Sequence, residues 1–211
     1  MLMARIRDTN APFQVRAYAL RLLTPQNKNF TEPLWQSLLA TGDAEILQEL
    51  TRALAANQTN KARKILFELA EDSSVKSPIR ADAIAGLSLA SEEGIPRLIR
   101  LANTDERALR EEAIRSLRYC KLSDDQRNEL QTIGKRYPDS GDLVNAALRP
   151  AKIGEGRPPT AETATWQKRL NEIQQPVDVN AGRRIFHHAQ VGTSVSYTHL
   201  RAHETREDRG C

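Results

Sequence analysis

Cysteine and aromatic residues are scarce in this chain of 211 residues, and each shortage excludes a class of protein. The two cysteines, Cys120 and Cys211, cannot form the dense framework of disulfides that stabilises small secreted domains. Aromatic residues make up 5% of the sequence, too few for a β-sandwich, whereas Leu, Ala, Arg and Glu are abundant. The composition therefore favours an all-α fold.

Long apolar runs and a strong excess of either charge are also missing. No stretch approaches the roughly 20 apolar residues that span a bilayer, so we expect no transmembrane segment. The opening residues, MLMARIRDTNAPFQ, lack the apolar centre of a secretory signal, so the protein is cytoplasmic or its natural N-terminus lies upstream. With 31 basic and 27 acidic residues the net charge is +4, too small an imbalance to indicate a nucleic-acid or membrane partner.

One helical pattern recurs along the first half of the chain. Apolar or small residues occupy the first, fifth and ninth places of four stretches, as on one face of a helix. Counted from the second residue of each, the stretches begin at 16, 47, 80 and 110, so the spacing is 31, 33 and 30 residues. The stretches are VRAYALRLL (15–23), ILQELTRAL (46–54), IRADAIAGL (79–87) and LREEAIRSL (109–117).

Another helix-compatible stretch lies between successive members. Pro33 and Pro96 suit the first turn of such a helix, where a missing N–H costs nothing. Ser123 with Gln126 forms a capping box, and 41–43 indicate the end of one helix and the start of the next. These stretches cover 32–40, 61–70, 94–102 and 123–137.

The unit is thus helix–turn–helix, about 30 residues long, with further N-caps expected at Ser77 and within 103–105. Neither helix can bury its apolar stripe alone, so stacked units share one core. We predict a right-handed α–α superhelix of about four helix pairs over 1–148, closed by a short capping helix at 143–148. An irregular helical bundle is the alternative. It is disfavoured because helix-breaking residues and apolar faces recur at the same positions in each repeat.

The repeats resemble HEAT repeats, chiefly through EEGIPRLIRLANTDERALREEAIRSLRY at 92–119. There, Pro-x-Leu-Ile in one helix precedes an aspartate and an Arg-rich second helix, with Asp105 and Arg110 at the family's positions. The resemblance covers about 11–137, although the spacing is shorter than the family average and the unit at Ile46 lacks the arginine. It implies a HEAT-like fold and little about function.

A linker rich in proline and glycine follows at 149–162. A helix is then expected over 163–173, with Trp166 as the packing anchor of that segment. Next, PVDVNAGRRIFHHAQVGT (176–193) resembles the lead-in to the haem-attachment site of small c-type cytochromes. In that family an Asp and an Ala-Gly precede a helix of the type Gly-Arg-Arg-hydrophobic-Phe, here 182–186.

The cytochrome resemblance implies that Cys-x-x-Cys-His should follow the loop at 191–193. Ser194 stands where the first cysteine belongs, and the sequence contains no Cys-x-x-Cys-His. The region 163–193 is therefore interpreted as a linker helix and the N-terminal part of a cytochrome c domain. We expect haem c in the full-length protein and no cofactor in this chain.

The sequence changes character from Ser194 onward. VSYTHLRAHET (195–205) resembles the translation of a transposase adapter used in sequencing libraries, which encodes these eleven residues in this order. A serine codon formed at that junction begins with T, as cysteine codons do, so the natural gene can continue with the missing cysteine. We interpret 194–211 as an artefactual tail, which we expect to be disordered, and the cytochrome domain as truncated.

We assign no catalytic, cofactor-binding or metal-ligating residue to this chain, and we do not expect an enzyme. His199 and His203 have the spacing of a zinc-binding pair, but both belong to the adapter-like run. His187 and His188 are adjacent and cannot chelate one ion together. Cys120 ends an apolar helix face and is expected to be a small buried hydrophobe.

Charged residues of the second helices are expected to pair with one another. Glu111-Glu112 and similar acid pairs indicate helix-dipole partners and solvated surface. Interleaved acids, among them Asp82 and Glu49, favour ion pairs over DNA binding along a basic face. The arginines concerned are Arg16, Arg21, Arg80, Arg107, Arg110, Arg115 and Arg118.

The sequence therefore favours a non-catalytic helical-repeat segment of a larger protein, resembling large bacterial proteins that join a propeller, helical repeats and a cytochrome c domain. Its expected partners are proteins or neighbouring domains of the same chain, with no small-molecule substrate, and nucleic acid is not favoured. The cytochrome resemblance implies a periplasmic or membrane-associated protein. The alternative is a free-standing HEAT-like module that binds protein or nucleic acid in the cytoplasm.

Overall fold

The computed structural model describes residues 1–57, 59–87, 92–118, 120–149, 159, 161–172 and 178–187. Within these ranges the regular elements are all helices, so the predicted all-α class is confirmed. The expectations for 188–211, including the loop before Ser194 and the adapter-like tail, lie outside the described residues. Among those described, no helix has the length and apolar character that crossing a bilayer requires.

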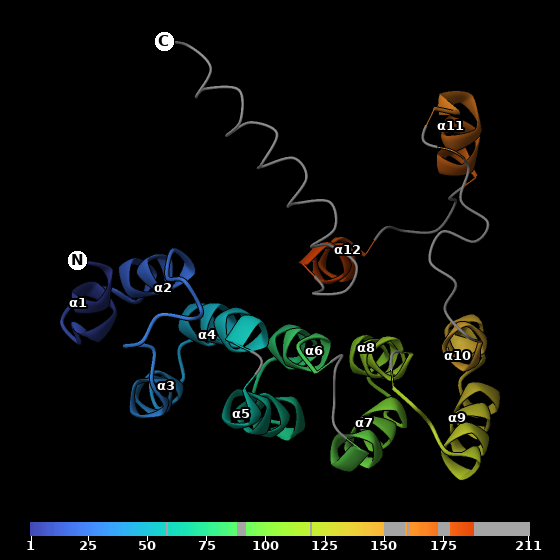
Figure 1. Cartoon of the computed structure of the whole chain (residues 1–211), viewed down its shortest axis with the longest axis horizontal. Coiled ribbons are helices and arrows are strands. Elements are labelled where there is room, and N and C mark those ends of the chain that lie inside the picture. The colour runs from blue at the N-terminus through green and yellow to red at the C-terminus, as the bar shows by residue number, and fades with distance from the viewer. Residues whose placement is uncertain are drawn as a thin grey trace.

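The helices alternate between two layers that follow the chain (Figure 1). The first-helix layer contains α3 (Glu32–Leu39), α5 (Asn60–Glu71), α7 (Ile95–Ala102) and α9 (Asp124–Arg136). The second-helix layer contains α2 (Phe13–Arg21), α4 (Ala44–Asn57), α6 (Ser77–Ala85), α8 (Arg107–Leu117) and α10 (Gly141–Leu148). Each second helix packs on the first helix of its pair and on the second helix of the next pair. The fold is therefore a stack of helix pairs.

The described residues form five pairs, one more than the sequence predicts. The short helix α1 (Leu2–Arg7) packs against α2 as its first helix, and it escaped prediction because it has only six residues and no capping side chain. α10, expected as a terminal cap, is the second helix of a fifth pair and packs on both α9 and α8.

Side-chain caps set several helix boundaries where the sequence places them. Asp43 Oδ1 accepts the backbone N–H groups of Glu45 and Ile46 at 3.0 Å, which starts α4. Gly42 before it has φ +62°, a left-handed conformation that suits glycine at the end of α3. The capping box of Ser123 and Gln126 begins α9.

Two predicted N-caps are wrong by one or more residues. Ser77 lies inside α6, because the carbonyl of Lys76 accepts the N–H groups of both Ile79 and Arg80. The residue that precedes α8 is Glu106 rather than one of 103–105. In both cases the helix begins without a side-chain hydrogen bond from its N-cap residue, so a search for capping side chains misplaces the boundary.

One continuous apolar core runs through all five pairs, from Ile6 in α1 to Ala147 in α10. Its central side chains, such as Leu50 and Leu109, are fully buried, and each contributes about 1.5–3 kcal/mol by leaving water. This shared core is what the repeating apolar face predicts. Packing is tight at Gly86, directly after α6, where a Cβ would lie 2.7 Å from the Cβ of Ala55 in α4.

Two helices follow the fifth pair. α11 (Thr163–Asn171) buries none of its residues, and the half-buried Trp166 donates from Nε1 to the carbonyl of Pro159 at 3.2 Å, within its own segment. α12 (Val179–His187) packs on α6, on the side of the second-helix layer that faces away from the first-helix layer (Figure 1).

Candidate functional site

A buried arginine occupies the fourth position of the second helix in three pairs: Arg16 in α2, Arg80 in α6 and Arg110 in α8. Arg16 donates from Nε to the carbonyl of Ile6 at 3.1 Å, and Arg80 donates from Nε to the carbonyl of Ala70 at 3.0 Å. Each acceptor is the last residue but one of the first helix in the same pair. We call these three residues the arginine ladder.

The ladder also links successive pairs. Arg80 Nη1 lies 2.7 Å from Glu106 Oε1, at the start of the next second helix. Arg110 donates to Ser140 Oγ at 2.9 Å and to Asp139 Oδ2 at 2.7 Å, again at the start of the next second helix. The guanidinium groups are thus engaged inside the stack, which satisfies their buried donors. Arg80 and Arg110 thus form the ion pairs expected for the second-helix arginines, whereas Arg16 bonds to a carbonyl.

The second pair departs from the ladder. Leu47 holds the fourth position of α4, and Thr41 Oγ1 donates to the carbonyl of Leu38 at 2.7 Å. Leu38 is the last residue but one of α3, so a threonine hydroxyl takes over the hydrogen bond that an arginine makes elsewhere. At the start of the next second helix, Lys76 replaces the acidic partner.

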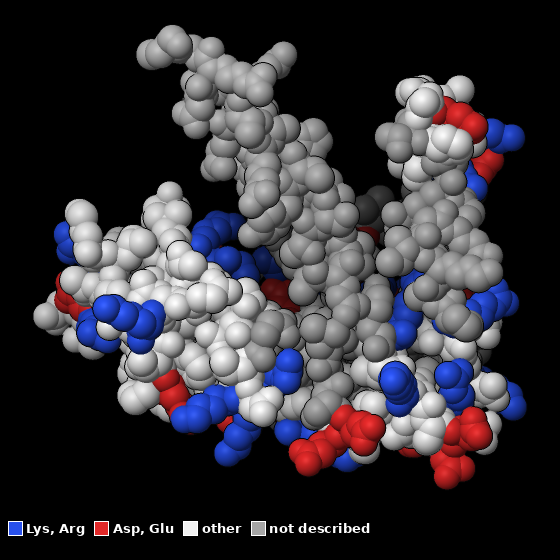
Figure 2. Space-filling view, in the orientation of Figure 1, with Lys and Arg blue, Asp and Glu red and all other residues white. Residues whose placement is uncertain are grey.

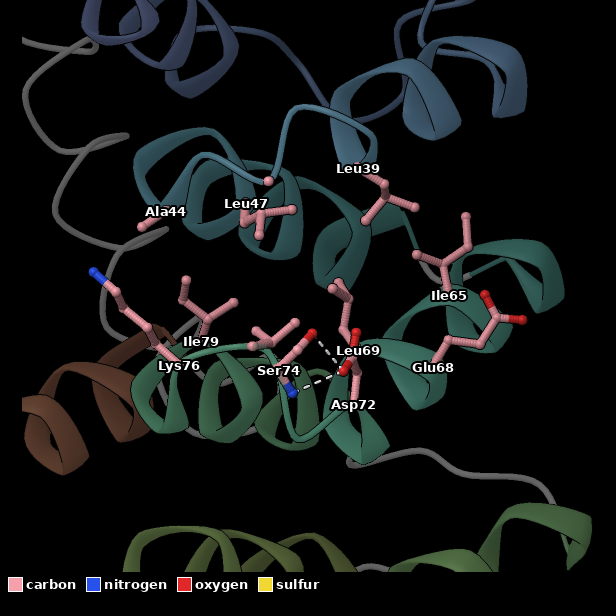
Figure 3. Close-up of a pocket in the computed structure, with 12 residues that line it drawn as sticks. Leu39, Ala44, Leu47, Ile65, Glu68, Leu69, Asp72, Ser74, Lys76 and Ile79 are labelled. Carbon is pink, nitrogen blue, oxygen red and sulfur yellow. Dashed lines mark hydrogen bonds between the residues drawn. The ribbon is translucent and has the colours of Figure 1, made fainter.

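A cavity of about 380 Å³ lies at this junction (Figure 3). Apolar side chains from α3 to α6 line it, including Leu47 and Ile65, with Glu68 and Asp72 as its acidic residues. Asp72 accepts hydrogen bonds from the hydroxyl and the N–H of Ser74 at 2.7 and 2.8 Å, which lower the pKa of its carboxyl group. The cavity is therefore lined mainly by apolar side chains, and the carboxylate of Asp72 is already hydrogen-bonded to Ser74 in the turn after α5.

A second, more polar site lies where α12 meets α6 and α8. Arg184 donates from Nε to Glu112 Oε1 at 2.8 Å, and Arg183 donates from Nη2 to Asp82 Oδ2 at 2.6 Å. The side chains of Arg184 and Glu112 are only 5% and 4% exposed. Arg184 Nη1 also lies 3.6 Å from Asp82 Oδ1. We call Asp82, Glu111 and Glu112 the acidic seat.

Arginines from two helices, α8 and α12, contact the acidic seat. Beneath α12, Arg115 of α8 donates to Glu112 Oε1 at 2.5 Å and to Glu111 Oε2 at 2.8 Å. Glu112 Oε1 thus accepts from Arg115 and from Arg184 at once. The expectation that Glu111 and Glu112 are solvated is wrong, because Glu112 is buried and Glu111 is half-buried. Glu112 contacts α12 through Arg184, whereas Glu111 pairs with Arg107 and Arg115 on its own helix.

A side-chain N-cap starts α12. Asp178 Oδ1 accepts the backbone N–H groups of Asn180 and Ala181 at 3.0 Å. The bond from Ala181, with the nearby positive charge of Arg184, lowers the pKa of the Asp178 carboxyl group. The Asp that precedes the Gly-Arg-Arg helix in the sequence is therefore the residue that starts this helix.

A metal site would need several nitrogen, sulfur or oxygen ligands from neighbouring described side chains. Among them, no group of three or more His, Cys, Asp and Glu could hold a metal ion. Cys120 is half-buried rather than fully buried, its Sγ lies 3.6 Å from the carbonyl of Ser116, and burial raises the pKa of its thiol. The positions expected for His188, His199 and His203 lie outside the described ranges.

No family model, curated protein or solved structure matches this chain. Its function must therefore be argued from its own residues. The feature that sequence reasoning missed is the acidic seat, because Asp82 and Arg183 are 101 residues apart. The sequence does contain a signal for this contact. Two adjacent arginines follow the helix-starting Asp178, and acidic residues lie on two earlier second helices with which they could pair.

Proposed function

We propose that this chain is a non-catalytic scaffold of HEAT-like helical repeats within a larger protein. Its terminal domain, of which 176–193 is the beginning, is an electron-transfer domain of the c-type cytochrome kind. The observation that carries the proposal is the docking of α12 on the second-helix layer. The helix that resembles the start of a haem domain is held by buried ionic contacts to the repeats.

The arginine ladder supports the HEAT-like part of the proposal. Arg110, at the family's arginine position, donates from Nη1 to the carbonyls of Thr104 and Asp105 at 3.0 and 3.2 Å. Tyr137 of the next pair donates its hydroxyl to Asp105 Oδ1 at 2.9 Å. Arg110 thus forms hydrogen bonds within its own repeat, and Asp105 links that repeat to the next through Tyr137.

The distribution of charge supports a protein partner over nucleic acid. Both signs of charge lie along the lower edge of the view in Figure 2. Arginines of the second helices bond to carbonyls and carboxylates of the same chain, for example Arg80 to Glu106 and Arg107 to Glu111. Such neutralised arginines contribute little to the phosphate contacts on which DNA affinity depends.

The proposal places haem in the full-length protein only. Residues 194–211 are adapter-derived in this interpretation, and the natural chain continues from Thr193 into Cys-x-x-Cys-His. Because haem is attached to such cytochromes outside the cytoplasm, the full-length protein is periplasmic or membrane-associated. The partners of the repeats are neighbouring domains of the same chain or other proteins.

Sequencing the locus from the original genomic DNA tests the proposal directly. We expect codons for Cys-x-x-Cys-His immediately after Thr193. Expressed with cytochrome maturation machinery, the extended protein should carry covalent haem with its absorbance bands, and the 211-residue chain should carry none. A genomic reading frame that runs unbroken through His-Leu-Arg-Ala-His would overturn the proposal. Salt-sensitive DNA binding by the repeats would favour the alternative, a free-standing binding module.

A further inference from the structure

α12 is bound through its charged face. Ala181 and Arg184 are buried, whereas Val179 and Ile185 are 75% and 42% exposed. An amphipathic helix normally turns its apolar residues toward the body of the protein. Among the described side chains of α12, the two arginines contact the repeats whereas Val179 and Ile185 face outward, so the described contact is mainly ionic.

We propose that the acidic seat is a docking site specific for the Asp-capped Arg-Arg helix of the same chain. Through it, the repeats hold the terminal domain on the second-helix layer. The remainder of that domain then packs on the outward side of α12, over Val179 and Ile185. This placement of the domain rests on the proposed function; the seat itself does not.

Asp82 gives the clearest evidence that the seat is built for α12. Among the described residues, its ion pairs are with Arg183 and Arg184, at 2.6 and 3.6 Å. It lies on α6, and among the described residues no arginine of the repeats pairs with it in the way that Arg115 pairs with Glu112. With α12 in place the side chain of Asp82 is 14% exposed, and both of these partners belong to α12.

Glu112 gives a second and independent argument. Its carboxylate is buried, and burying a charge is strongly unfavourable unless it is paired and hydrogen-bonded. Arg115 supplies one guanidinium and Arg184 supplies the other, both to Oε1. Arg184 is equally buried and also lies 4.0 Å from Asp178 at the start of its own helix. The contact therefore pairs the carboxylates of the acidic seat with the arginines of α12, so that neither set of charges is buried without a partner.

A charge exchange in the 211-residue chain tests the seat. Asp82→Asn and Asp82→Arg leave the sequence of α12 unchanged, yet we expect each to accelerate amide hydrogen exchange in α12 at least tenfold. Arg183→Asp should have the same effect. Combining Asp82→Arg with Arg183→Asp should restore part of the lost protection, since Arg184 remains beside position 82. Arg169→Asp, on the exposed helix α11, is the matched control and should change nothing in α12.

The outcomes separate clearly. Unchanged exchange in α12 after both Asp82 substitutions, or no recovery in the exchanged pair, would overturn the proposal. Exchange in α8 serves as the check that the repeats stay folded. This experiment has no haem readout, so it succeeds or fails independently of the proposed function.

The placement of the terminal domain is tested in the extended protein. Asp82→Arg should leave the haem absorbance unchanged and increase the radius of gyration measured by small-angle X-ray scattering. An unchanged radius would refute the placement, whereas a missing haem band in the parent protein would refute the proposed function.

Discussion

Arg80 donates from Nε to the carbonyl oxygen of Ala70 over 3.0 Å, joining the second helix of the third pair to the end of its first helix. Arg16 makes the same contact with Ile6. Because both guanidinium groups are buried, these bonds are shielded from competing water. The arginine ladder therefore stabilises the turns of the repeats as well as their packing.

Replacing Arg80 with methionine should keep the apolar stem and remove every donor. We expect the free energy of unfolding to fall by about 2 kcal/mol, since a buried carbonyl loses its partner and Glu106 loses its ion pair. Urea unfolding followed by far-UV circular dichroism measures the loss. Arg21→Met is the control: its side chain is 63% exposed, so it should cost about 0.5 kcal/mol or less. Equal losses in the two variants would contradict this role of the ladder.

Leu47 stands where the arginine ladder has an arginine, which predicts that substitutions at Leu47 and Lys76 affect the free energy of unfolding non-additively. Leu47→Arg alone should cost about 2 kcal/mol, because the new guanidinium meets a carbonyl already bonded to Thr41 and a like charge at Lys76. Adding Lys76→Glu recreates the acid found at Glu106 in the ladder and should recover part of the loss. A double-mutant cycle on unfolding free energies should give a coupling of about 1 kcal/mol. Purely additive values would show that the position is not equivalent to the other rungs.

Gly86 predicts a packing effect. A methyl group there would meet Ala55 Cβ at 2.7 Å and Leu66 Cδ1 at 3.1 Å, so Gly86→Ala must push the second and third pairs apart. We expect a loss of about 2 kcal/mol, seen as a fall in thermal midpoint of several degrees. At Gly182 nothing lies within 4 Å of the added methyl. Gly182→Ala should therefore be neutral or raise the stability of α12 through its helix propensity.

Glu71 predicts a pH effect. Arg97 bonds both of its carboxylate oxygens, at 2.8 and 2.6 Å, and this hydrogen bonding, aided by the charges of Arg97 and Arg100, lowers the pKa of Glu71. A lowered pKa in the folded state adds stability above the ordinary value of about 4.3, and that stability is lost as the pH falls through the lowered value.

Substitution at this pair should remove part of that pH dependence. Glu71→Gln should lower the urea midpoint at pH 7 and flatten its decline below about pH 4.3. The loss at neutral pH should be about 1 kcal/mol or less, because the pair is half-exposed. Arg97→Met should flatten the decline in the same way. A decline as steep as in the parent chain would mean that other carboxyl groups account for it.

Local periodicity predicted the repeat helices well. The eight helices expected from the apolar pattern are all present, with ends within three residues of the expected positions. The pattern succeeds because each repeat helix must turn one apolar stripe to the shared core. It misses α1, which is too short to show a period and begins without a capping side chain.

The acidic seat could not be predicted in the same way. Glu112 and Arg184 are 72 residues apart, and a polar residue on a helix gives no sign of which distant segment will cover it. The negative charge of Glu112 suggests a solvent-exposed side chain in the sequence, but in the structure that charge pairs with Arg184 of α12. Leu47 is intermediate: the sequence showed the missing arginine, but only the structure shows Thr41 in its place.

The position of α12 also affects how the whole array can bend. Arg183 fastens it to α6 and Arg184 fastens it to α8, so a single helix clamps the third and fourth pairs together. Since an array of repeats flexes by small rotations between neighbours, this junction is stiffened. We therefore expect less bending between the third and fourth pairs than at the junctions that α12 does not span.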